Sequence, residues 1–152
     1  MKQIHVECLP DEALVMKLGF ARKMITHHSG KSRVFNKLEK SKNVLALADE
    51  DPGSAKTTYE KKLKLRNDSN SITYYEDASG NKIFVLKVKL ENWIIEQCKI
   101  SNVSPQDYGF TAKPNEFHDV INQRLERFRE LLGALIDKNN PGIIQLKSFL
   151  SS

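Results

Sequence analysis

Carboxylates follow two apolar segments that have the character of buried strands. Asp49 and Asp51 come directly after the apolar run 44–48, and Glu7 ends the shorter apolar run 4–6. Open α/β sheets place their ligand sites at the carboxyl ends of parallel strands. If the two strands are neighbours, these three carboxylates converge at one edge of the sheet.

The residue types in this group suit a hard divalent metal ion. Carboxylate oxygens are the ligands that Mg²⁺ and Mn²⁺ prefer, and Mg²⁺ usually keeps several waters or substrate oxygens as well. Side chains two residues apart in an extended segment point to the same side, so we expect Asp49 and Asp51 to address one ion while Glu50 points away. Because an Asp-x-Asp before Pro-Gly is also a common polar turn, the predicted metal site depends on Glu7.

A basic segment directly after these acids predicts contact with nucleic acid. The chain has 152 residues and a net charge of +5. Between residues 56 and 66 it carries Lys56, Lys61, Lys62, Lys64 and Arg66 against only Glu60. A phosphate backbone bound there would lie beside the metal, and Lys31, at the start of another predicted helix, is a further phosphate contact. The alternative is a solvated, lysine-rich helix face.

The order of predicted elements indicates an α/β fold. Strands are expected at 4–8, 24–27, 44–48, 72–75 and 82–90, and helices at about 10–22, after 31, at 55–65, after 91, at about 115–138 and near 143–150, with loops at 67–71 and 101–113. The nearly unbroken apolar character of 44–48 is typical of a central parallel strand. Residues 77–81 have the composition of a hairpin turn.

Composition favours one soluble domain over residues 1–152. Its length suits one hydrophobic core, and 39% hydrophobic with 28% charged residues is ordinary for a globular protein. No apolar run approaches a membrane span, and the first residues have no signal-peptide pattern, so we expect a cytoplasmic protein without membrane contact. Cys8 and Cys98 have no metal-ligand spacing, and we expect reduced, buried thiols.

Two segments resemble the motifs of the TOPRIM domain. They are Val6-Glu7-Cys8-Leu9-Pro10-Asp11-Glu12, before a predicted helix, and Ala48-Asp49-Glu50-Asp51-Pro52-Gly53, after a predicted strand. This domain occurs in topoisomerases, bacterial primases, recombination-repair proteins and nucleases of the overcoming-lysogenization-defect type. The resemblance covers about residues 3–95 and leaves a helical extension at about 114–150. It implies a compact, mostly parallel sheet flanked by helices, with acids that bind Mg²⁺ or Mn²⁺.

The resemblance assigns roles to individual acids. Glu7 matches the family's glutamate, Asp49 and Asp51 match its Asp-x-Asp, and these three would be the catalytic residues, with Glu7 as the general acid or base. Asp11 matches a further acid four residues later. Glu91 resembles the Leu-Glu pair that opens a helix in related nucleases, although a glutamate there is also favoured by the helix dipole. The implied metal ligands are Glu7, Asp11, Asp49, Asp51 and Glu91.

Departures from the family pattern narrow the expected chemistry. Gly53 occupies the position of a third aspartate, which favours a nuclease over a topoisomerase, and Cys8 replaces the usual glycine. The expected partner is nucleic acid, with DNA favoured over RNA, and related nucleases suggest a separate ATPase subunit. The C-terminal helix would contact that subunit, form a homodimer or pack within the chain. A non-catalytic binding module and a CheY-like phosphoacceptor are the competing interpretations.

Overall fold

The computed structural model describes residues 2–152, and within them six strands form one sheet. The strands are β1 (Ile4–Val6), β2 (Ile25–His27), β3 (Leu45–Asp49), β4 (Lys64–Ser69), β5 (Ile72–Glu76) and β6 (Lys82–Leu86), and their order across the sheet is β2-β1-β3-β6-β5-β4. The first four strands in this order are parallel to one another. β5 then pairs antiparallel with β6 on one side and with β4 on the other. The predicted α/β class with a mostly parallel sheet is confirmed.

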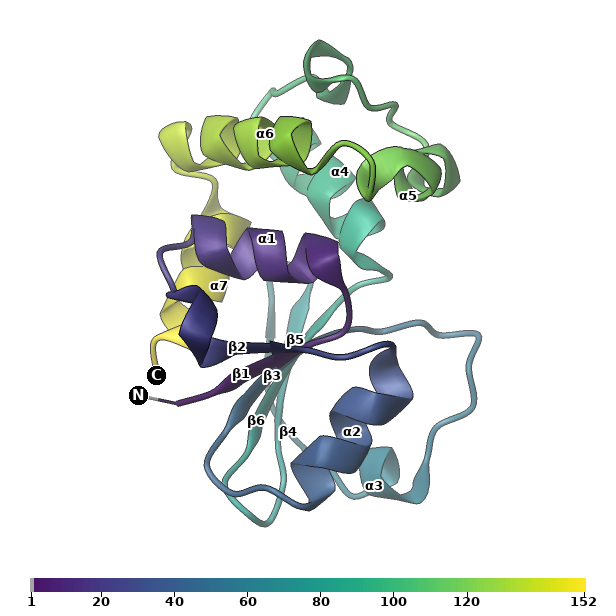
Figure 1. The fold of residues 1–152 in the computed structure, drawn as a ribbon, viewed down its shortest axis with the longest axis vertical. Coiled ribbons are helices and arrows are strands. Elements are labelled where there is room, and N and C mark those ends of the chain that lie inside the picture. Colours follow the sequence, from purple (N-terminus) through teal and green to yellow (C-terminus); the bar gives the residue numbers. More distant parts are fainter. Residues whose placement is uncertain (1) are drawn as a thin grey trace.

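Helices cover both faces of this sheet (Figure 1). Within residues 2–152 they are α1 (Leu9–Lys17), α2 (Lys31–Glu39), α3 (Thr58–Lys61), α4 (Leu90–Ile100), α5 (Pro114–Ile121), α6 (Leu125–Asp137) and α7 (Pro141–Leu150), with short 3-10 turns η1 (Arg22–Met24) and η2 (Pro105–Tyr108). The pleat of β3 directs Leu45 and Leu47 to the core under α1, α4, α6 and α7, and Ala46 and Ala48 to the core under α2. None of these helices has the length and apolar character to cross a membrane.

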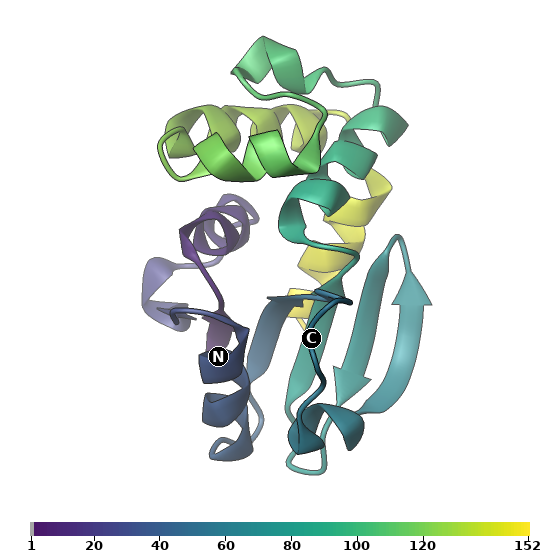
Figure 2. The ribbon, with the colours of Figure 1, turned by 90° about the vertical axis from the view of Figure 1, so that its right-hand side faces the viewer.

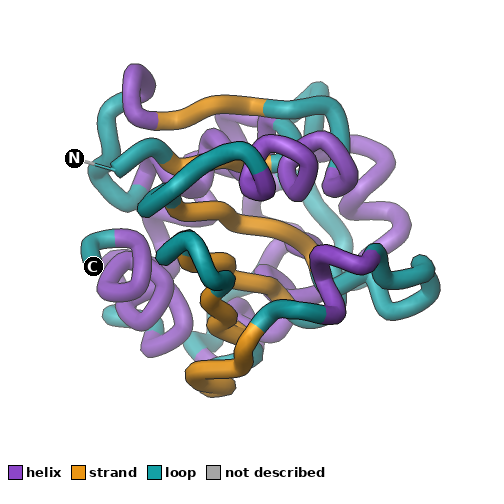
Figure 3. The backbone as a smooth tube through the Cα atoms, turned by 90° about the horizontal axis from the view of Figure 1, so that it is seen from below, coloured by secondary structure: helices purple, strands orange, loops and turns teal. Residues whose placement is uncertain are grey.

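The strand order creates a crevice at the carboxyl ends of β1 and β3. From β1 the chain crosses one face of the sheet through α1 to reach β2, and it then crosses the other face through α2 to reach β3, on the opposite side of β1. Figures 2 and 3 show the strands side by side between the two helical layers. Reversals of strand order of this kind are where open α/β sheets bind ligands.

The C-terminal helices pack on the same core as the sheet, so the predicted helical extension is confirmed. Phe149 of α7 stacks on Phe84 of β6 with ring centroids 5.0 Å apart. Phe110 stacks on Phe117 of α5 at 4.4 Å and meets Phe128 of α6 edge-on at 6.4 Å. The two cysteines are free thiols, as predicted, but only Cys98 is buried and Cys8 is half-buried.

The prediction of a basic helix over 55–65 followed by a loop at 67–71 is wrong. Only Thr58–Lys61 is helical, and Lys64–Ser69 forms β4 at the edge of the sheet. Asn70 and Ser71, with φ of 54° and 58°, form the two-residue turn to β5. Because β4 is almost fully exposed, it lacks the apolar alternation by which a strand is recognised.

Two predicted helices also end earlier than expected. The first stops at Lys17 instead of Arg22, since Gly19 has a φ of 105° that ends the helix. The single helix expected over about 115–138 is two helices, α5 and α6. Phe117 of α5 and Phe128 of α6 both pack on Phe110. Apolar residues therefore recur at helical spacing on both sides of the break, and the sequence pattern does not reveal it.

A buried asparagine connects the loops at the opposite end of the sheet from the crevice. The Asn81 carbonyl oxygen accepts from the Val44 N–H at 3.0 Å, and its amide nitrogen donates to the Leu38 and Ser41 carbonyl oxygens at 2.9 and 3.0 Å. The same nitrogen donates to Asp77 at 2.8 Å. This side chain therefore joins the end of α2 and the start of β3 to the β5–β6 turn.

We expect Asn81→Ala to lower the free energy of unfolding by about 2–4 kcal/mol, because it leaves several buried backbone groups without partners. Urea denaturation followed by circular dichroism measures the change. Asn36→Ala, at an exposed position of α2, is the matched control and should change stability by less than about 0.5 kcal/mol. Equal effects of the two substitutions would contradict the role of Asn81.

Candidate functional site

Four carboxylates from separate elements gather at the carboxyl ends of the parallel strands. Glu7 follows β1, Asp11 lies in the first turn of α1, Asp49 ends β3, and Glu91 is the second residue of α4, after β6. Each of Glu7, Asp11 and Glu91 raises the pKa of Asp49 through its charge. The fold therefore brings together acids that are up to 84 residues apart in the sequence.

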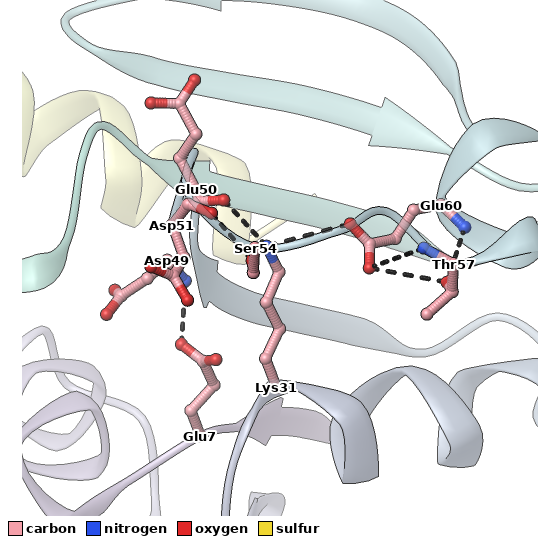
Figure 4. Close-up of polar contacts among 8 residues, drawn as sticks. All are labelled: Glu7, Lys31, Asp49, Glu50, Asp51, Ser54, Thr57 and Glu60. Atoms are coloured by element: carbon pink, nitrogen blue, oxygen red, sulfur yellow. Dashed lines mark hydrogen bonds and ion pairs between the residues drawn. The ribbon is translucent and has the colours of Figure 1, made fainter.

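Hydrogen bonds hold these acids to the ends of the strands. Glu7 Oε2 accepts from the Asp49 backbone N–H at 2.8 Å, which ties the end of β1 to β3 (Figure 4). Asp49 Oδ1 in turn accepts from the N–H of Leu90, the first residue of α4, at 3.0 Å. This bond supplies an acceptor at the positive end of the α4 dipole. Asp11 Oδ2 accepts from the Cys8 thiol at 3.2 Å.

Within residues 2–152, each of these carboxylates has one oxygen without a hydrogen bond. His118 of α5 bonds to Glu91 Oε1 at 2.9 Å, and Glu91 Oε2 is the oxygen without one. Asp11 is 1% exposed, and its Oδ1 is buried without a hydrogen-bond partner among the described residues. Buried carboxylate oxygens normally have partners, so Asp11 Oδ1 is an exception within this fold.

Burial and mutual repulsion raise the pKa values of Glu7, Asp11 and Asp49. Desolvation is the largest cause for Glu7, Asp11 and Asp49, followed for Asp11 and Asp49 by the charges of the other acids. The Lys31 charge and the Asp49 N–H bond act in the opposite direction on Glu7. Without a cation, the group therefore retains protons above the usual range for carboxyls.

The donor set fits a hard divalent cation by its chemistry. Among residues 2–152, no three His, Cys, Asp or Glu side chains are already arranged to hold a metal ion. However, Mg²⁺ commonly takes only one or two protein carboxylates and completes its coordination with water and substrate oxygens. Glu7, Asp11 and Asp49 each have a carboxylate oxygen that could serve as such a ligand. Among the described residues, the oxygen of Asp11, Oδ1, is buried without a hydrogen-bond partner.

Asp51 does not continue the extended geometry of β3. Its φ of 47° turns the chain, so the alternation expected between Asp49 and Asp51 ends there. Asp51 lines a groove on the α2 side of the sheet, although its charge still raises the pKa of Glu7. Glu50 lies near Lys87 and contributes to the raised pKa of that side chain.

Lys31 lies between Glu7 and Glu60 (Figure 4) and lines this groove. Its ammonium donates to the Glu50 carbonyl oxygen at 2.9 Å and is 3.9 Å from Glu60 Oε2. Glu60 is itself held by a capping box with Thr57 at the start of α3. Lys31 is therefore a fixed positive charge beside the carboxylates.

The predicted basic residues do not all share one surface. Lys31 and Lys56 line the same groove, but Lys62 lines another hollow, next to Tyr59 and Asp77. Lys61 is exposed on α3. The structure thus places Lys31 and Lys56 in one groove, and of these Lys31 acts on the pKa of Glu7.

Sequence reasoning missed His118 and Glu60. The spacing Thr57-x-x-Glu60 is a capping-box signature and was available as a signal for the start of α3. Nothing local indicates His118, because it meets Glu91 only when α5 folds back over the start of α4.

Comparison with known proteins gives no relative from which a function could be inferred. The chain matches no protein-family model, no curated protein and no solved structure. The resemblance to the TOPRIM domain therefore rests on the two short motifs, and the site is interpreted from its own chemistry.

In metal-free buffer, we expect Asp49→Asn to be more stable than the unchanged protein at about pH 8. The unfolded chain loses its carboxyl protons near pH 4, whereas folded Asp49 retains its proton to higher pH, so the free energy of unfolding falls as pH rises above that value. Asparagine keeps the acceptor for the Leu90 N–H and removes this cost.

Thermal denaturation in EDTA at about pH 4 and pH 8 tests this expectation. The variant should match the unchanged protein at the lower pH and melt several degrees higher at the upper one. Asp107→Asn, at an exposed position, is the control and should show no such pH-dependent difference. A variant that melts lower than the unchanged protein at pH 8 would contradict the electrostatic account.

Proposed function

We propose that this chain is a metal-dependent nuclease that hydrolyses phosphodiester bonds of nucleic acid, with a TOPRIM-like acidic site and DNA as the favoured substrate. The observation that carries the proposal is the gathering of Glu7, Asp11, Asp49 and Glu91 at one sheet edge, with a buried oxygen of Asp11 left without a partner. Ordinary surface acids do not combine burial, mutual repulsion and a missing partner.

In this proposal the acids hold Mg²⁺ or Mn²⁺ through their uncommitted oxygens. A bound ion of this type lowers the pKa of its water and offsets negative charge on phosphate. Glu7, which has a raised pKa and lies between Asp49 and Lys31, is the proposed proton acceptor or donor. Lys31 and Lys56, in the adjacent groove, would bind the phosphates that flank the cleaved bond.

The rival is a binding module with the same fold and no catalytic activity, since a fold does not establish an activity. The observation that favours it is that no three potential ligand side chains among residues 2–152 are already arranged around a metal position. It predicts nucleic-acid binding without cleavage, so a cleavage assay separates the two functions.

We expect Mn²⁺ or Mg²⁺ to support cleavage of single-stranded or plasmid DNA, and Glu7→Gln and Asp49→Asn each to reduce the rate by at least about 100-fold, because the metal loses a ligand. Gel assays with purified variants measure the loss, and Asp107→Asn should retain full activity. Circular dichroism verifies that the variants are folded. Metal-independent cleavage, or full activity in Asp49→Asn, would reject the proposed site.

We also expect millimolar Mn²⁺ to raise the melting temperature of the unchanged protein and not that of Asp49→Asn. Binding of the ion must displace protons from acids with raised pKa values, so the increase should be larger at about pH 8 than at about pH 6. Differential scanning fluorimetry measures both values. A shift shared equally by the variant would show that the ion binds elsewhere.

A further inference from the structure

A groove of about 200 Å³ lies beside the acidic group, on the α2–α3 side of the sheet. Apolar side chains from four elements or connecting segments line it: Phe35, Leu63, Tyr75 and Val85. Asp51 lies in the same lining, so the groove adjoins the end of β3 from which the acidic group extends.

The polar lining of this groove combines two lysines, Lys31 and Lys56, with three acidic residues, Glu50, Asp51 and Glu60. Lys31 Nζ is 5.6 Å from the centre of the Phe35 ring and donates to the Glu50 carbonyl oxygen. Lys56 is exposed on the loop that follows Asp51, where the Ser54 hydroxyl donates to the Asp51 carbonyl oxygen at 2.8 Å. A bound molecule would therefore contact both the apolar side chains and the polar groups of the lining.

We propose that this groove receives one unpaired nucleobase, next to the phosphate that the acids address, so that the preferred substrate is single-stranded nucleic acid. This inference rests on the proposed nuclease function and extends it to the class of substrate. Flat heterocycles bind to aromatic and aliphatic walls regardless of base identity, while lysines bind the flanking phosphates. The groove joins the aromatic side chains of Phe35 and Tyr75 to the cations of Lys31 and Lys56 in this way, and a metal ion held by the neighbouring acids would offset the carboxylates of its lining.

Duplex substrates do not fit the same groove. A paired base is covered on both faces by its neighbours and exposes only its edges, so it enters a pocket only after it leaves the stack. Single strands and frayed ends, whose bases are already unstacked, avoid that energetic cost.

The test compares a single-stranded DNA oligonucleotide with the same oligonucleotide in a duplex, each containing 2-aminopurine, in Ca²⁺-containing buffer. Leu63→Trp fills the groove, and Ile100→Trp, at the exposed end of α4 and outside the groove lining, is the control. We expect the single strand to bind at least tenfold more tightly than the duplex, with a change in 2-aminopurine fluorescence. Leu63→Trp should weaken that binding about tenfold, and Ile100→Trp should not.

A second variant protects the test against loss of folding. Tyr75→Leu removes one of the two aromatic side chains of the lining without filling the groove, and it should weaken single-strand binding several-fold while the circular dichroism spectrum is preserved. Equal affinity for single strand and duplex, or equal effects of Leu63→Trp and Ile100→Trp, would overturn the base-binding groove.

The cleavage assay separates this inference from the proposed function. If Asp49→Asn abolishes cleavage while Leu63→Trp leaves the single-strand preference intact, only the groove proposal fails. If no cleavage occurs but Leu63→Trp weakens single-strand binding, the groove stands and the nuclease proposal fails.

Discussion

The hydrogen bond from the Asp49 backbone N–H to the Glu7 carboxylate joins the ends of two neighbouring parallel strands, and the candidate site is built around it. Parallel neighbours end at the same edge of a sheet, so whatever follows each strand meets there. Asp11 arrives with the helix after β1, and Glu91 with the helix after β6. The strand ends that this hydrogen bond joins therefore also bring several carboxylates close together.

Bringing these acids together lowers the stability of the folded protein, so other interactions must compensate for it. Burial and repulsion raise the pKa values of Asp11 and Asp49, which is the response expected of carboxylates held together without a cation. The Leu90 N–H, at the positive end of α4, and the nearby Lys31 charge compensate in part. A hard divalent ion would compensate further, and for this reason the same geometry that destabilises the metal-free protein suits a metal-binding role.

Several features followed from the sequence because their signals are local. The apolar run that became β3 indicated a strand covered on both faces, and the acids at its end indicated a site. The edge strand β4 and the break between α5 and α6 could not be predicted in this way. An exposed strand needs no apolar alternation, and two helices that face one aromatic cluster keep a common spacing.

The sequence by itself determined the α/β class and the positions of Glu7 and Asp49 at the ends of strands, because hydrophobic runs and chain order are properties of the sequence. Only the tertiary structure decided that Asp51 turns towards the Lys31 groove, that Glu91 joins the acids and that His118 contacts it. These depend on a left-handed backbone angle and on contacts between distant segments. Local residue patterns do not carry the contacts of Glu91 and His118, since these arise only when helices pack against the completed sheet.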